Sequence, residues 1–344
     1  MRAAHILFPL GLWMAVGGCN VQSSQLPDPS GAIGPEVLEP APSRKTTSER
    51  IARRNLDASI DALGRRFATR PDVQNGAVLV DHLLLRADHY GTFDDWDQAL
   101  SVARAALELE PENARAILLH TRVLNRVHEF DAALQLIDEA RTSSDALASS
   151  PELEAEARHL ELTVRLAQGD PANDIATRRQ ALATGFPSFQ NLTGLALAWA
   201  SHGRFEEADA AFRLALEGYR DVSPFPFAWV AFQRGVMWSE QADRPDLGRG
   251  LYEEALHYLP GYVLANVHLA ELDAQEGDVA AAIARVERLI SSTQDPEPLA
   301  LLAALEPSEL RAREYGARAD ALYRELLSRF PNAFAHHIEE ESAR

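Results

Sequence analysis

The chain has 344 residues, of which 46% are hydrophobic and 24% are charged. This composition excludes wholesale disorder, and the length exceeds one ordinary core, so we expect two domains or an elongated array. The formal net charge of −18 would repel phosphates and argues against a nucleic-acid partner.

The first 18 residues have the layout of a secretory signal peptide. Arg2 supplies a positive start, an apolar run covers residues 6–16, and two small residues, Gly17 and Gly18, follow it. The run is too short to span a bilayer as a stable helix. We therefore expect residues 1–18 to be removed from the mature chain.

Cys19 follows directly and is the only cysteine in the sequence. One cysteine excludes an internal disulfide and a cysteine-based zinc site. The stretch Val16-Gly17-Gly18-Cys19 resembles the lipobox of bacterial lipoproteins, although leucine is commoner than valine at its first position. The resemblance implies that the Cys19 thiol takes a diacylglycerol as a thioether and that cleavage frees its amine for acylation. Several acyl chains would anchor the protein durably; the alternatives are a chance cysteine in a cleaved signal and an uncleaved anchor.

These features predict a protein of the bacterial cell envelope that is held to a membrane by lipid on Cys19. Asn20 stands next to the cysteine, and by analogy with enteric bacteria the absence of Asp there favours the outer membrane. The folded part would lie in the periplasm or at the cell surface. Residues 19–47 contain recurrent prolines among serines and glycines and show no regular period, so we expect a disordered tether.

The character of the chain changes after residue 47. Thr46 and Glu49 have the spacing of a capping box, and apolar residues recur at helical spacing up to Phe67. This pattern predicts an amphipathic helix that ends near Arg70 and Pro71. No later stretch alternates convincingly with period two, so the predicted fold class is all-α.

Helices then follow in pairs with a recurring pattern. Alanines stand where two helices would cross, Gly or Asp-Gly turns reverse the chain, and prolines close the second helix. We expect about seven units within residues 48–344, some of them degenerate. The clear units are 80–113, 114–147, 189–222, 228–262 and 263–295, and the weaker ones are 151–187 and 297–331.

Spacings such as Ala99 to Pro111 and Ala208 to Ala215 resemble those of the 34-residue tetratricopeptide-repeat (TPR) family. The resemblance implies a right-handed α-solenoid of antiparallel helix pairs, in which stacking buries the apolar face that one pair cannot bury alone. It also implies a concave groove, lined by the first helix of each pair, that binds a partner.

Two features stand out on the helices that would line this groove. Arg115, Arg122 and Arg126 form a basic stripe in an acidic chain, and residues 223–238 are the densest aromatic stretch. Together they could take an extended peptide or helix with apolar anchors and a carboxylate. The alternatives are arginines paired with neighbouring glutamates and aromatics that belong to the core. The partner-binding candidates are Arg115, Arg122, Arg126, Trp229, Phe232, Gln233 and His268.

The sequence contains no glycine-rich phosphate loop, no G-x-S-x-G and no H-E-x-x-H motif. His336 with Glu340 and His337 with Glu341 have the i,i+4 spacing of a metal-binding helix face. They lie in a polar terminus, which favours a solvated tail. We therefore predict no enzymatic activity, no metal and no cofactor.

The predicted function is that of a lipid-anchored scaffold whose concave groove binds another protein or peptide in envelope assembly, with no nucleic-acid partner. The alternative is capture of a small peptide or glycan ligand in the aromatic groove.

Overall fold

The computed structural model describes residues 44–143, 147, 150–169 and 172–335. Within these ranges the regular structure is helical and contains no strand, which confirms the all-α class. The helices are α1 (Glu49–Thr69), α2 (Val73–Tyr90), α3 (Asp94–Leu109), α4 (Ala114–Arg126), α5 (Phe130–Ser143), α7 (Pro151–Ala167), α8 (Ala172–Gly185), α9 (Phe189–Ala200), α10 (Phe205–Gly218), α11 (Phe225–Val236), the π-helical turn η2 (Met237–Gln241), α12 (Pro245–Tyr258), α13 (Val263–Gln275), α14 (Val279–Glu287), α15 (Glu297–Leu305), α16 (Glu309–Arg329) and α17 (Pro331–Phe334).

Short polar side chains start several of these helices. The Asp72 carboxylate accepts a hydrogen bond from the Asn75 amide at the start of α2, and Ser188 does the same for Asn191 at α9. The first helix ends at Thr69, as the sequence predicted. Its start differs from the prediction, because Ser48 is the N-cap and makes no side-chain hydrogen bond, so the expected capping box of Thr46 and Glu49 does not form.

After α1 the helices pack as successive pairs: α2 with α3, α4 with α5, α7 with α8, α9 with α10, α11 with α12, α13 with α14, and α15 with α16. Small residues lie where the helices of a pair cross, and the side chains of Ala99, Ala208 and Ala255 are fully buried. A larger side chain there would push the two helices apart. The first pair begins at Val73, earlier than the expected boundary at residue 80.

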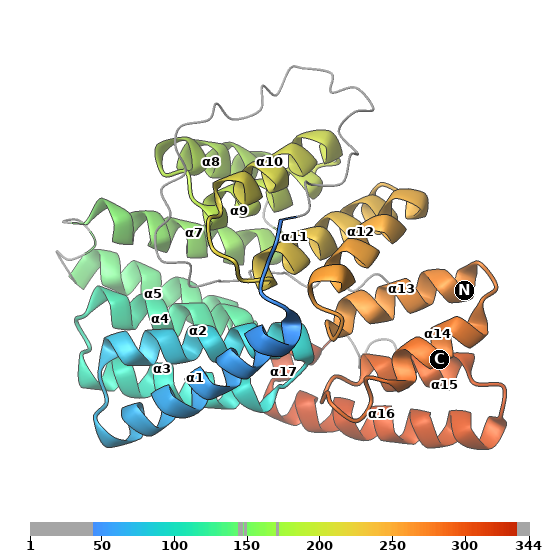
Figure 1. The fold of residues 1–344 in the computed structure, drawn as a ribbon. Helices are drawn as coiled ribbons and strands as arrows, with labels where there is room; N and C mark the ends of the chain where they lie inside the picture. The colour runs from blue at the N-terminus through green and yellow to red at the C-terminus, as the bar shows by residue number, and fades with distance from the viewer. Residues whose placement is uncertain (1–43, 144–146, 148–149, 170–171, 336–344) are drawn as a thin grey trace.

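The array curves until its two ends meet. Helix α13, in the sixth pair, contacts α2, in the first pair, and Figure 1 shows the red C-terminal helices beside the blue N-terminal ones. His89 at the end of α2 lies between the rings of Phe225 and Tyr262, at centroid distances of 5.1 and 4.7 Å. The sequence predicted two domains or an elongated array, whereas the helix pairs of the described residues form one closed turn.

A second set of contacts closes the same turn, and we call the two sets together the seam. Phe330, just before α17, packs edge-on against Trp96 of α3 with the ring centroids 5.2 Å apart. Gly91 adopts a left-handed φ of 63°, and its carbonyl accepts a hydrogen bond from the Gln294 amide at 2.8 Å. The seam therefore joins parts of the fold that lie far apart in the chain, such as Trp96 and Phe330.

Residues 44–47 form the last part of the expected tether, yet they pack against the folded array. The Arg44 guanidinium donates to the carbonyl oxygens of Tyr219 and Glu217, at 2.5 and 3.2 Å. The Thr47 amide donates to the Val222 carbonyl at 2.8 Å. Ordered structure therefore begins before the boundary expected from composition. The remainder of the expected tether lies outside the described residues.

Candidate protein-binding surface

The three arginines expected to form a basic stripe lie on α4, but they differ in environment. Arg115 is exposed in the first turn. Arg122 is only 6% exposed; it forms an ion pair with Asp81 of α2 and donates to Glu156 of α7 at 2.9 Å. Arg126 is paired with Asp88, and its guanidinium lies 5.1 Å from the centre of the Trp96 ring. Of the three, Arg115 alone remains exposed.

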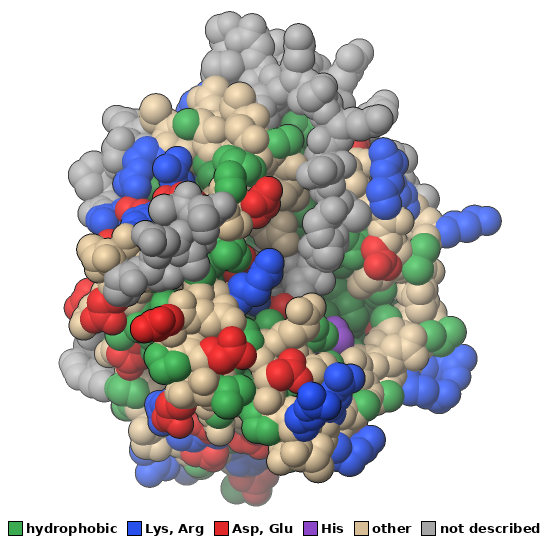
Figure 2. Space-filling view, turned by 90° about the vertical axis from the view of Figure 1, so that its left-hand side faces the viewer, with side chains coloured by type: hydrophobic (Ala, Val, Ile, Leu, Met, Phe, Trp, Pro, Cys, Tyr) green, Lys and Arg blue, Asp and Glu red, His purple; other side chains and the backbone are tan. Residues whose placement is uncertain are grey.

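The paired carboxylates lose much of their hydration. Burial raises the pKa of Asp81 to about 6, and the nearby Arg122 acts in the opposite direction. Burial also raises the pKa of Asp88, against the attraction of Arg126. Removing either arginine would leave a buried carboxylate without its cation, so both arginines have a structural role. Figure 2 shows one face of the molecule, on which acidic and basic side chains are intermixed around a hollow and neither sign forms a continuous stripe.

Pairing of these arginines with neighbouring carboxylates was the stated alternative to a basic stripe, but the partners themselves were not named, although a signal for one of them was present. Arg122 and Glu156 are separated by 34 positions, which is the length of one repeat. Residues one repeat apart occupy equivalent places on neighbouring units, and opposite charges at this spacing predict an ion pair between the units. The same comparison across the chain could have identified Glu156 before the structure was known.

The aromatic candidates on α11 lie in the core. Trp229 is 1% exposed and packs against Phe189 and Phe212, with centroids 6.4 and 6.3 Å away. Phe232 is also 1% exposed and contacts the rings of Tyr262 and His268. Gln233 on the same helix is buried. The expectation that these side chains are accessible to a partner is therefore wrong, because their helix presents them to neighbouring pairs.

His268 on α13 is the candidate that keeps partial exposure beside charged groups. Its Nδ1 atom lies 2.6 Å from Glu240 Oε1, and the side chain is 23% exposed. Burial lowers the pKa of His268, but the carboxylates of Glu240 and Glu271 outweigh it, so that this pKa is raised above its usual value. Glu240 is held in place by the π-helical turn η2 and by a 3.1 Å hydrogen bond from the Tyr252 hydroxyl.

Two further carboxylates near this region were not anticipated. Burial raises the pKa of Glu297 at the start of α15 to about 7, helped by the charge of Asp295, although Tyr323 donates a 2.7 Å hydrogen bond to it. Burial likewise raises the pKa of Asp295 to about 6. The sequence gives no sign of either shift, because both depend on how α15 and α16 pack.

Within the described residues, no group of three or more His, Cys, Asp or Glu side chains could hold a metal ion. No helix there combines the length and apolar character needed to cross a membrane. Cys19, His336, His337, Glu340 and Glu341 lie outside the described residues, so the lipid-attachment prediction stays a prediction.

Comparisons with known proteins identify the repeat. The sequence model of the tetratricopeptide repeat family matches residues 241–305, whereas none of the curated protein sequences compared with this chain matches it. The crystal structure of the APC/C hetero-tetramer Cut9-Hcn1 aligns with a TM-score of 0.54 and 17% identity, over 85% of this chain and 51% of that one. The human IFIT1 dimer with m7Gppp-AAAA aligns with a TM-score of 0.54 and 13% identity, over 81% of this chain and 68% of that one.

This chain thus spans about half the length of the first of these structures. At such low identities the likeness concerns the fold and not the ligand. The likeness of fold agrees with the stacked helix pairs, the buried alanines at their crossings and the curvature of the array. Residues 241–305 match the tetratricopeptide repeat model, and the described residues as a whole form an α-solenoid of TPR-like helix pairs.

Proposed function

We propose that this protein is a scaffold that binds another protein or peptide, and that lipid on Cys19 holds it to a membrane of the bacterial envelope. The observation that carries the proposal is the solenoid itself, because stacked TPR pairs generally form non-catalytic scaffolds that display an extended binding surface. The lipobox-like sequence before Cys19 supports the membrane location.

The first helices of three successive pairs carry partly accessible side chains, which we assign to contact with such a partner. Leu197, Val236 and Leu264 are half-buried on α9, α11 and α13, and His268 is close to the last of them on α13. Arg115 adds an exposed cation on α4. Apolar anchors with a polar rim are the usual composition of a peptide-binding surface.

Crosslinking in native membranes, followed by mass spectrometry of the captured protein, tests the scaffold. We expect one protein to be recovered reproducibly, and we expect Arg115→Glu to lower its yield at least about fivefold, the effect of roughly 1 kcal/mol. Arg313→Glu is the matched control, because Arg313 is an arginine that is 81% exposed on α16. Recovery of no specific protein, or equal loss in both variants, would contradict the scaffold.

The lipid anchor needs a separate test. Cells grown with labelled palmitate should label the wild-type chain and leave the Cys19→Ser variant unlabelled, because the thiol is the proposed attachment point. Mass spectrometry should find the acylated peptide beginning at Cys19. A labelled Cys19→Ser chain, or an unmodified thiol in the wild type, would refute the anchor and leave the scaffold untouched.

The alternative of ligand capture in an aromatic groove has lost its main support. It relied on exposed aromatic side chains at Trp229 and Phe232, and both are buried. We therefore keep the protein-binding scaffold as the proposed function.

A further inference from the structure

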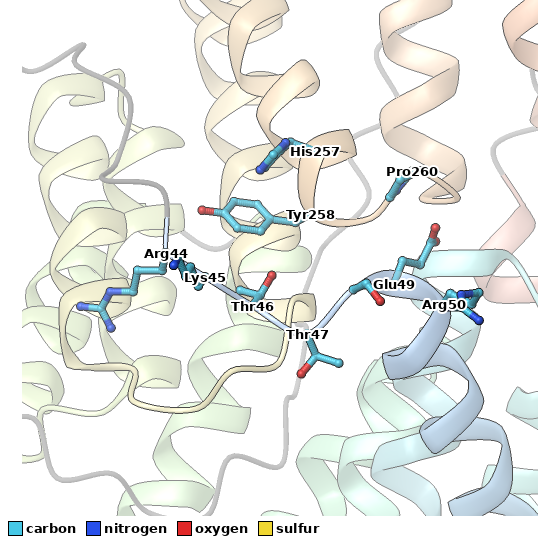
Figure 3. A pocket seen from close by; sticks show the side chains of 10 residues that line it. Arg44, Lys45, Thr46, Thr47, Glu49, Arg50, His257, Tyr258 and Pro260 are labelled. Atoms are coloured by element: carbon cyan, nitrogen blue, oxygen red, sulfur yellow. The ribbon is translucent and has the colours of Figure 1, made fainter.

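A cavity of about 630 Å³ lies where the first described residues run past the end of α12. One wall is the segment 44–50, and the other is formed by His257, Tyr258 and Pro260, as Figure 3 shows. The segment is fixed in place by the hydrogen bonds of Arg44 and Thr47 to residues 217–222. The cavity is therefore a built feature between two parts of the fold.

The walls of this cavity carry mostly positive charge. Arg44, Lys45 and Arg50 line the cavity as cations, His257 adds an imidazole ring, and the single lining carboxylate is Glu49. Glu49 is already engaged, because its Oε1 atom accepts a hydrogen bond from the Gly261 amide at 2.9 Å. Lys45 and Arg50 are exposed, and neither forms a hydrogen bond or ion pair within the part of the chain that the structure describes.

This cavity contrasts with the rest of the protein. The whole chain has 51 acidic against 33 basic residues, whereas the lining segment 44–50 (RKTTSER) has three basic residues and one acidic one. Concentrating like charges costs free energy unless an anion neutralises them. The hydroxyl groups of Thr46, Thr47 and Ser48 add neutral donors to the same wall.

We propose that this cavity binds a phosphate group, carried either by an anionic lipid headgroup or by a small soluble phosphate ester. Arginine, lysine and hydroxyl donors together suit the several oxygens of a phosphate, which one cation alone would not satisfy. The volume leaves room for the polar group to which the phosphate is attached. Binding of phosphate does not depend on the proposed function. A lipid headgroup as the carrier of that phosphate does depend on it, because the protein must then lie at a membrane.

The position along the chain favours the headgroup. Arg44 is 25 residues after Cys19 in the sequence, so the cavity is close along the chain to the proposed lipid. A basic surface that close to a bilayer attracts anionic lipids by about 1 kcal/mol for each lysine or arginine. The cavity would then act as a second membrane contact beside a covalent lipid.

Vesicle flotation with the full chain carrying Cys19→Ser tests this idea without acyl chains. One vesicle contains 30% phosphatidylglycerol in phosphatidylcholine, and the other is phosphatidylcholine alone. The double variant Lys45→Gln/Arg50→Gln should bind the anionic vesicle roughly tenfold more weakly than the parent, while the two chains bind the neutral vesicle alike. Arg313→Gln, at an arginine that is 81% exposed on α16, should leave both affinities unchanged.

Calorimetric titration with inorganic phosphate, at constant ionic strength, forms the second arm. If the parent gives heat of binding with phosphate and the double variant does not, a soluble phosphate is a ligand. If the double variant loses vesicle binding but neither chain gives heat with phosphate, the ligand is the lipid headgroup. The proposal is overturned if the double variant equals the parent in both arms, or if Arg313→Gln reproduces its loss. The palmitate result at Cys19 is read independently, so failure of the lipid anchor and failure of the phosphate site are distinguishable.

Discussion

Arg329 at the end of α16 and Asp97 in α3 are 232 positions apart, yet their Nη2 and Oδ2 atoms are 2.5 Å apart. The same guanidinium reaches Asp94 at 2.7 Å. These ion pairs lie at the rim of the seam, and the rings of Phe330 and Trp96 lie beneath them. The two ends of the array thus stabilise one another.

The apolar part of the seam should carry most of its energy. Phe330→Ala should lower the free energy of unfolding by about 3–5 kcal/mol, because a buried ring leaves a cavity. Arg329→Ala should cost less than about 1 kcal/mol, since both carboxylates are largely exposed. Urea unfolding measures both values. Hydrogen exchange in Phe330→Ala should accelerate in α2 and α3, and unchanged exchange there would show that the ends are not coupled.

Gly91 and Gly203 provide a matched pair of glycines with left-handed φ values of 63° and 72°. A Cβ atom at Gly91 would overlap Thr293 Oγ1 and come within 2.8 Å of Asp295 Cβ, whereas a Cβ at Gly203 meets nothing within 4 Å. Gly203→Ala should therefore lower the free energy of unfolding only by the strain of a left-handed backbone, about 1–2 kcal/mol. Gly91→Ala should lower the free energy of unfolding by about 1–3 kcal/mol more than Gly203→Ala does, because Thr293 and Asp295 in the seam must shift. Equal losses in thermal unfolding would argue against the steric account.

The pair of Arg234 and Asp209 is the most deeply buried charge pair described, with 1% and 0% exposure. Arg234 donates to both carboxylate oxygens, and the Trp238 indole donates to one of them. Asp209→Ala should lower the free energy of unfolding by about 3–5 kcal/mol, because the buried guanidinium loses the carboxylate to which it donates and keeps only Glu254, at 4.0 Å. Glu309→Ala removes an 89% exposed partner of Arg313 and should change stability by less than about 0.5 kcal/mol.

Glu297 should make stability fall as pH rises. Its pKa in the folded chain is about 7, above the usual 4.5. The folded state therefore holds the proton more tightly, and the contribution of Glu297 is fully present below about pH 4.5 and is lost as pH rises through about 7. Glu297→Gln keeps an acceptor for Tyr323 and should be about 1–2 kcal/mol more stable than wild type at pH 8, with little difference near pH 4.5.

The measurement is the difference in unfolding free energy between Glu297→Gln and wild type across this pH range. Differences are needed because His89 acts in the opposite direction: burial lowers its pKa to about 4, so its contribution is lost as pH falls from about 6.5. Glu309→Gln, at a carboxylate that is 89% exposed, is the matched control. A flat difference for Glu297→Gln would refute the assigned shift.

The helices and their pairing could be predicted because both depend on local spacing. Alanines such as Ala99 and Ala208 recur at crossing positions, and the structure buries them fully. The environment of Trp229 could not be predicted in this way, because a small error in helix phase exchanges a groove position for a core position. Arg122 was placed on the correct helix, but its neutralisation by Asp81 required the relative position of α2 and α4.

The seam was beyond the reach of sequence reasoning for a different reason. Each helix pair turns by a small angle relative to the previous one, and whether the ends meet depends on the sum of all these angles. No single residue in the sequence indicates the value of that sum. Phe330 and Trp96 each look like an ordinary apolar position, and their contact follows only when every intermediate pair is in place.

This closure constrains how such a protein can change over evolutionary time. An open array can gain or lose a repeat by duplication or deletion and still present two sound ends. Here a repeat inserted between α3 and α13 would displace α13 from α2 and Phe330 from Trp96, so such an insertion must break the closure to be accommodated.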